Sequence, residues 1–146
     1  MNNMVYKTIK VLLIEDNAGD AKLIKNQLKE SDSIIFEITH AKRLSEGVIL
    51  FEEINFDAIL LDLDLPDSKG IDTFNKVRNK FKFAPIVILT GSVLERENIR
   101  KCIDGAQSYL LKGYTESDSL IDSISGAIYE QESRKLILSR LRYAAA

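Results

Sequence analysis

The sequence predicts an α/β fold in which a mainly parallel sheet carries helices on both faces. Short apolar runs alternate five times with segments whose apolar residues recur at the period of a helix. Most of these runs lack the apolar-polar alternation of a half-exposed strand, so both of their faces are expected to be buried. The 146 residues, with 45% hydrophobic content and a net charge of −2, suit one globular domain with a full core.

The five predicted strands differ in texture, which indicates where each lies in the sheet. Residues 11–14 and 86–89 are wholly aliphatic and suit interior strands, whereas residues 35–39 mix polar with apolar side chains and suit an edge. With right-handed crossovers, this predicts a doubly wound, flavodoxin-like sheet of strand order 2-1-3-4-5. The predicted strands are residues 9–14, 34–39, 58–61, 86–89 and 109–111.

A segment of helical period follows each predicted strand. Neither proline interrupts a helix, since Pro66 follows the third strand and Pro85 precedes the fourth. The last helix is expected over residues 117–143, about 40 Å, which is longer than the sheet needs as cover. We therefore predict a domain over residues 1–130 and a helical extension over 131–146. The apolar positions are Ala21/Ile24/Leu28, Leu44/Gly47/Val48/Phe51, Ile71/Phe74/Val77/Phe81, Ile99/Cys102/Ile103/Ala106 and Leu120/Ile124/Ala127/Ile128.

Polar side chains stand where four of the predicted strands end. Glu15 and Asp16 follow the first strand, Asp62 the third, Thr90 the fourth and Lys112 the fifth. Because the carboxyl ends of parallel strands meet at one edge of a sheet, these side chains are expected to share a pocket. Each motif alone has a plainer interpretation as a helix cap, a turn or a solvated charge. Their concurrence at one edge favours a functional site.

The residue types in this predicted pocket suit phosphoryl chemistry. Carboxylates about 4 Å apart repel by about 4 kcal/mol at an effective dielectric near 20, so three together call for a cation. Hard oxygen ligands favour Mg²⁺. Asp62, at a central strand end, is the best placed carboxylate to attack phosphorus and form an aspartyl phosphate. Lys112 and Thr90 are placed to stabilise the charge on the transferring oxygens, and Gly91 leaves backbone N–H groups accessible.

With these residues, the chain resembles the receiver domain of two-component response regulators, which include chemotaxis receivers of the same strand order. The resemblance runs from about residue 9 to about residue 128. It rests on an ordered set of motifs at residues 11–17, 58–67, 85–91 and 105–113.

The resemblance implies a role for each residue of the pocket. Asp62 is the phosphoacceptor, served by a histidine kinase or a histidine phosphotransfer protein. Glu15 and Asp16, together with Asp62 and the backbone carbonyl of Asp64, hold Mg²⁺. Lys112 contacts the phosphoryl oxygens. The receiver catalyses only its own phosphorylation and dephosphorylation, and it is not otherwise an enzyme.

The resemblance also implies a switch and a means of setting the phosphoryl lifetime. Thr90 moves toward the phosphoryl group and Tyr109 turns inward, which reshapes the face made by the fourth helix, the fifth strand and the fifth helix. Asp64 and Ser92 occupy the positions that tune the phosphoryl lifetime. We expect Asp64 to steer a water toward the phosphoryl group, so that this lifetime is moderate. Gly113 departs from the family, which usually has a proline after the lysine, often with a cis bond.

Two other classes of function compete with a signalling receiver. Asp62-Leu63-Asp64 resembles the nucleophile and acid pair of haloacid-dehalogenase-like phosphatases, but Glu15 and Asp16 precede it, contrary to the order in that family. A receiver-like adaptor that binds partners without phosphorylation is the third reading. It ranks lower because every expected site residue is present.

The remaining features indicate partners and location. No run approaches the roughly 18 residues of a membrane helix and no signal-peptide core is present, so a cytoplasmic protein without membrane association is expected. The net charge makes nucleic acid an unexpected partner. Cys102, the only cysteine, is expected in the core and His40 in a structural or surface role.

The extended last helix has three readings. It forms a coiled-coil homodimer, binds acidic partners through its arginines and lysine, or links the receiver to an output domain absent from this chain. The downstream target is then either that domain or a separate protein.

Overall fold

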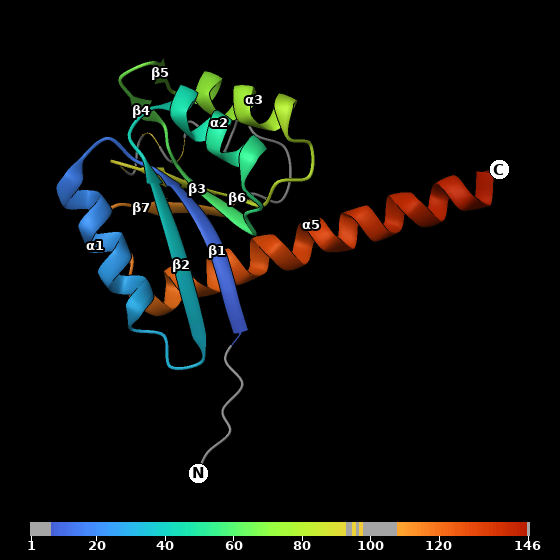
Figure 1. Cartoon of the computed structure of the whole chain (residues 1–146), viewed down its shortest axis with the longest axis horizontal. Helices are drawn as coiled ribbons and strands as arrows, with labels where there is room; N and C mark the ends of the chain where they lie inside the picture. The colour runs from blue at the N-terminus through green and yellow to red at the C-terminus, as the bar shows by residue number, and fades with distance from the viewer. Residues whose placement is uncertain (1–6, 93–94, 96, 98–107, 146) are drawn as a thin grey trace, which may run out of the picture.

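A computed structural model describes residues 7–92, 95, 97 and 108–145 of the chain. Five parallel strands form one sheet in the order β2-β1-β3-β6-β7 (Figure 1). A separate two-stranded antiparallel hairpin, β4-β5, takes two strand numbers, so this order is the predicted 2-1-3-4-5 and confirms it. The strands are β1 (Lys7–Ile14), β2 (Ile34–Ala41), β3 (Ala58–Asp62), β4 (Asp64–Leu65), β5 (Ser68–Lys69), β6 (Ile86–Thr90) and β7 (Ser108–Leu111).

Helices cover both faces of the sheet, as the doubly wound fold requires. The α1 and α5 helices pack on one face, while α2 and α3 pack on the other (Figure 1). The predicted helix that contains Cys102 lies outside the described residues. The described helices are α1 (Ala18–Lys29), α2 (Leu44–Glu53), α3 (Ile71–Lys80) and α5 (Ser117–Ala145).

The central strands divide their side chains between two apolar cores. Successive side chains on a strand point to opposite faces, so Leu12 and Ile14 enter the core under α2 and α3, while Val11 and Leu13 enter the core under α1 and α5. Each fully buried aliphatic side chain contributes about 1.5–3 kcal/mol of burial free energy. Together the two cores hold the carboxyl ends of the strands in fixed positions.

The β2 strand lies at the edge of the sheet, as its mixed sequence predicted. Its exposure alternates along most of its length, and Ile35 is 49% exposed. By contrast, every residue of β3 and of β6 is buried, as expected for interior strands.

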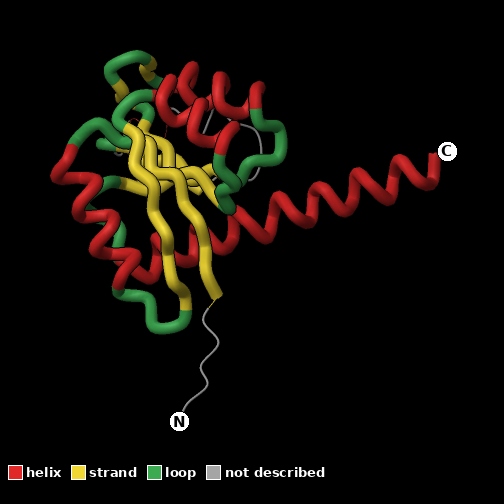
Figure 2. The backbone as a smooth tube through the Cα atoms, viewed as in Figure 1, coloured by secondary structure: helices red, strands yellow, loops and turns green. Residues whose placement is uncertain are grey.

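The α5 helix is 29 residues long and extends well past the sheet (Figure 2). Leu120, Ile124 and Ala127 are buried against the domain, and Gln131 is the last buried residue of the helix up to Tyr143. The following turns expose Leu136, Ile137, Leu138 and Leu141. No described helix has a stretch long and apolar enough to cross a bilayer.

Candidate functional site

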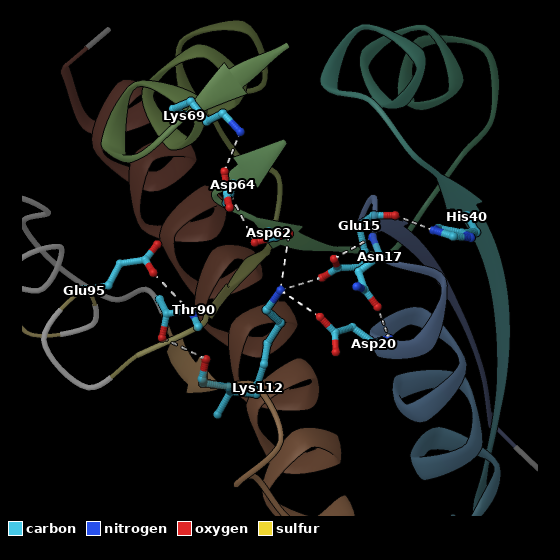
Figure 3. Close-up of polar contacts among 12 residues, drawn as sticks. Glu15, Asn17, Asp20, His40, Asp62, Asp64, Lys69, Thr90, Glu95 and Lys112 are labelled. Carbon is cyan, nitrogen blue, oxygen red and sulfur yellow. Dashed lines mark hydrogen bonds and ion pairs between the residues drawn. The ribbon is translucent and has the colours of Figure 1, made fainter. Parts of the chain in front are cut away.

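The side chain of Lys112 brings together carboxylates from three elements at the carboxyl edge of the sheet. Its Nζ lies 3.2 Å from Glu15 Oε2, just after β1, and 3.4 Å from Asp62 Oδ2, at the end of β3. It also lies 3.1 Å from Asp20 Oδ2 on α1 (Figure 3). The predicted convergence of Glu15, Asp62 and Lys112 is therefore present in the structure.

Burial makes this cluster electrostatically demanding. Glu15 is 0% and Asp62 2% exposed. Burial, with the neighbouring Asp62 charge, raises the pKa of Glu15 to about 8. Burial also raises the pKa of Asp62, although hydrogen bonds and the Lys112 charge oppose that rise. Burial disfavours the charged form of Lys112, but Asp62 and Glu15 outweigh it and raise the Lys112 pKa. One ammonium thus does not fully compensate the buried carboxylates, and the raised pKa of Glu15 favours its protonated form until a cation binds.

Three of the carboxylates have the spacing of a cation site. Glu15, Asp16 and Asp62 each offer one oxygen, and these oxygens lie within 4.8 Å of one another. Asp16 is exposed whereas the other two are buried, so the set opens toward solvent on one side. All-oxygen donors suit a hard divalent cation such as Mg²⁺. The uncompensated negative charge of the cluster favours binding of that cation.

Asp20 belongs to this cluster, although the sequence indicated only a helix terminus at this point. Its N–H donates to the Asn17 side chain at 2.9 Å, and Asn17 thereby caps α1. The same position directs the Asp20 carboxylate back over the helix N-terminus, toward Lys112. The Asn17-x-x-Asp20 spacing beside a strand end was the available signal.

Two further contacts fix Glu15. The Asn17 N–H donates to Glu15 Oε1 at 3.1 Å, and the His40 ring nitrogen Nε2 lies 2.6 Å from the Glu15 carbonyl oxygen. His40 comes from the edge strand β2 and bonds the backbone behind the site (Figure 3). This contact with the backbone is a structural one, as the sequence led us to expect for His40.

The loop after β3 is organised around Asp62 and the β4-β5 hairpin. The Asp64 N–H donates to Asp62 Oδ1 at 3.1 Å. The exposed Asp64 side chain forms an ion pair with Lys69, whose Nζ lies 2.5 Å from Asp64 Oδ1. Asp67, further along the loop, accepts hydrogen bonds from Leu44 N and Ser45 N, and so caps α2. The loop after β3 is therefore attached to both the hairpin and α2.

Thr90 occupies the end of β6 but does not contact the acidic cluster. Its buried hydroxyl donates to the Leu110 carbonyl at 3.3 Å, on the neighbouring strand β7. Tyr109, one residue earlier on β7, is partly buried and packs against the core under α2 and α3. The Thr90 hydroxyl thus has a backbone partner on β7, and Tyr109 lies one residue before that partner on the same strand.

Ser92 and Glu95 each accept a hydrogen bond from a nearby backbone N–H, an arrangement that was not predicted. Ser92 Oγ accepts from Glu95 N at 3.1 Å, and Glu95 Oε2 accepts from Gly91 N at 3.4 Å. The spacing Ser-x-x-Glu is that of a capping box and was the available signal. The Gly91 N–H, expected to be accessible to a phosphate, therefore has a carboxylate partner here.

Gly113, where the family usually has a proline, adopts a left-handed backbone conformation. No cis peptide bond occurs among the described residues, and Gly113 has a φ of +82°. Glycine reaches this left-handed region readily, whereas proline cannot. The Lys112 N–H donates to the Thr90 carbonyl at 2.8 Å, which aligns the two strand ends beside the cluster.

Comparison with known families and sequences agrees with this geometry. Residues 11–125 match the response regulator receiver domain family. The chain is 34% identical over 120 residues to the cell cycle transcriptional regulator CtrA of Caulobacter vibrioides, covering 82% of this chain and 50% of that protein. The chain therefore spans about half the length of this relative.

Solved structures give the same picture. A response regulator receiver domain from Clostridium thermocellum is 28% identical, with a TM-score of 0.68 over 89% of this chain and 98% of that one. The receiver domain of a LuxO repressor protein from Vibrio parahaemolyticus is 26% identical, with a TM-score of 0.69 over 89% of this chain and 97% of that one.

Proposed function

Because this chain belongs to the response regulator receiver domain family, we propose that Asp62 accepts a phosphoryl group and that the chain acts as a phosphorylation-controlled signalling switch. The observation that carries this proposal is the position of Lys112, whose ammonium lies between the Asp62 and Glu15 carboxylates. An ammonium at that point contacts the acceptor before transfer and the phosphoryl oxygens after it.

The chemical step is a displacement at phosphorus. An Asp62 carboxylate oxygen forms the new P–O bond while the P–N bond of a phosphohistidine donor breaks, and that electron pair stays on the imidazole nitrogen. Charge on the three transferring oxygens is stabilised by Lys112. The Asp64 N–H, already bonded to Asp62 Oδ1, fixes the rotation of the acceptor carboxylate.

The acidic residues fit a resident Mg²⁺. Glu15, Asp16 and Asp62 would hold it with their carboxylates, and we propose the backbone carbonyl of Asp64 as a further ligand. When bound, this ion neutralises charge on the carboxylates and on phosphoryl oxygens. Glu15 must lose its proton to serve as a ligand, and the Asn17 N–H already favours its anionic form.

The switch is proposed to act through Thr90 and Tyr109. Thr90 must exchange its hydrogen bond to the Leu110 carbonyl for one to the phosphoryl group. That exchange leaves space beside β7 for Tyr109 to turn, and it reshapes the face formed by the fourth helix, β7 and α5. Asp64 and Ser92 are proposed to set the phosphoryl lifetime.

The partners follow from this chemistry. We propose a histidine kinase or a histidine phosphotransfer protein as donor, and an output domain or a separate protein as the downstream target. CtrA of Caulobacter vibrioides, twice the matched length, is a transcriptional regulator, which is consistent with a receiver that controls an attached output domain. Residues 1–130 are the proposed receiver and 131–146 its helical extension, while a homodimer through that helix stays a prediction.

Intact mass spectrometry tests the acceptor. The chain is incubated with Mg²⁺ and acetyl phosphate, and compared with Asp62→Asn and with Asp72→Asn, a control on the exposed first turn of α3. We expect one labile phosphoryl adduct in the parent and in Asp72→Asn, and none in Asp62→Asn. An equal adduct in Asp62→Asn rejects Asp62 as the acceptor. Continuous turnover of a generic phosphate ester would indicate a phosphatase instead.

A further inference from the structure

A groove lies at the amino edge of the sheet, where α5 leaves the domain. Lys82 and Phe83, in the turn between α3 and β6, form one side of it, and α5 forms the other. Its volume is about 270 Å³. The apolar part is made by Phe83, Ile137 and Leu138, and the last two are 57% and 42% exposed.

The groove is cationic. Lys82 and Arg134 line it, and Lys135 Nζ lies 5.9 Å from the centre of the Phe83 ring. Among the described residues, no carboxylate forms an ion pair with any of these three cations. This end of the molecule thus presents cations around apolar side chains.

A buried guanidinium adds to this excess of positive charge. Arg78 Nη1 donates to the carbonyl groups of Phe81, Lys82 and Ala84, but Arg78 Nη2 is buried without a hydrogen-bond partner. Burial and the nearby Arg134 charge lower the pKa of Arg78. Arg78 therefore adds positive charge behind the groove without lining it.

Charge decides which kind of helix fits here. The turns of α5 that carry Ile137, Leu138 and Leu141 also carry Arg134, Lys135, Arg140 and Arg142, with no acidic residue from Ser133 onward. The same turns of a second copy, packed side by side, would bring like charges together. A bilayer surface is flat and does not enter a groove between a helix and a loop.

We propose that this groove binds an acidic amphipathic helix of a partner protein, whose apolar side chains contact Phe83 and Leu138 and whose carboxylates pair with Lys82, Arg134 and Lys135. The site lies at the opposite edge of the sheet from Asp62. Binding does not require phosphorylation, so failure of this inference would leave the proposed function intact.

Fluorescence anisotropy tests the groove with a designed helical peptide of about 18 residues, with leucines at i, i+3, i+4 and i+7 and glutamates on both flanks. The full chain is titrated against this peptide and against the same peptide with glutamine for glutamate. We expect binding of the acidic peptide only, weakened about tenfold by Arg134→Glu and by 0.5 M salt. Lys22→Glu, a charge reversal on the exposed surface of α1, should change nothing.

Exchanging the charges of the peptide and the groove distinguishes loss of the ion pairs from loss of the fold. A peptide with lysines in place of the glutamates should bind Arg134→Glu/Lys135→Glu better than it binds the parent. Amide shifts in the parent should change at Phe83 and Leu138 on adding the acidic peptide.

Several outcomes would overturn the proposal. These are no acidic-peptide binding at roughly millimolar concentration, equal binding of the glutamine peptide, and amide shifts that change only elsewhere. A dimer that Leu138→Glu dissolves would assign the surface to a second copy. Binding to vesicles of phosphatidylcholine and phosphatidylserine, without binding of the peptide, would assign it to a membrane.

Discussion

The two edges of the sheet carry opposite excesses of charge. At the carboxyl edge, the carboxylates of Glu15, Asp20 and Asp62 surround the ammonium of Lys112, and the Asp16 carboxylate lies close to those of Glu15 and Asp62. At the amino edge, Lys82, Arg134 and Lys135 surround an apolar groove and have no described carboxylate partner.

Burial separates the consequences of these two excesses. Glu15 and Asp62 are shielded from water, so burial and mutual repulsion disfavour their charged forms and raise their pKa values. Binding of a cation or a proton relieves this repulsion. Arg134 and Lys135 are exposed, so water and salt screen them and their charge costs little. A buried excess of charge therefore favours chemistry at one point, whereas an exposed excess favours recognition of a surface.

Replacing one lysine at each edge should give the largest difference between the two edges. Lys112→Met removes the only ammonium of the buried cluster, and we expect phosphoryl incorporation at Asp62 to fall about 100-fold or more. Lys82→Met, at the exposed edge, should leave incorporation unchanged. Both are measured as the rate of adduct formation with acetyl phosphate. Equal rates in the parent and Lys112→Met would remove Lys112 from the mechanism.

The pH dependence of stability should report the buried charges of the carboxyl edge. Because the pKa of Glu15 is raised from 4.5 to about 8 by burial, folded Glu15 keeps a proton that the unfolded chain loses. Without Mg²⁺, the free energy of unfolding should therefore be highest below pH 4.5, as far as Glu15 is concerned, and fall as the pH rises to about 8. We expect a loss of roughly 2–4 kcal/mol in urea titrations. Glu15→Gln should flatten this dependence, and an unchanged slope in that variant would assign it to other groups.

Mg²⁺ should bind only at the carboxyl edge and stabilise the folded chain from there. A cation that binds the folded chain at 100 times its dissociation constant adds about 2.7 kcal/mol, which thermal denaturation detects as a shift of several degrees. Asp16→Asn should reduce that shift, whereas Arg134→Glu should not. An equal shift in Asp16→Asn would place the bound ion elsewhere.

The sheet could be predicted from sequence because its signals are local and strong. The aliphatic runs of β3 and β6 specify strands with two buried faces, and the mixed pattern of β2 specifies an edge. The β4-β5 hairpin escaped prediction because two strands of two residues each have no periodicity. Its effect is nevertheless important, since it places Lys69 against Asp64.

The site was predictable as far as strand ends determine it. Glu15, Asp62 and Lys112 terminate or follow interior strands, so parallel topology alone brings them together. Asp20 lies on a helix, and its role depends on the direction of one side chain. The hydrogen bond of Thr90 to the Leu110 carbonyl depends on the side-chain rotamer of Thr90, which sequence periodicity does not predict.

The smallest expected effect concerns the ion pair between Lys69 and Asp64. Lys69 holds the exposed Asp64 carboxylate, and its hydrogen bond and charge lower the pKa of Asp64. In Lys69→Ala, the freed carboxylate can orient a water toward the phosphoryl group, so we expect the Asp62 adduct to decay a few-fold faster. Asp64→Ala should slow decay, and the double variant should match Asp64→Ala because the group that Lys69 restrains is gone. Faster decay in the double variant than in Asp64→Ala would show that Lys69 acts on the phosphoryl group by another route.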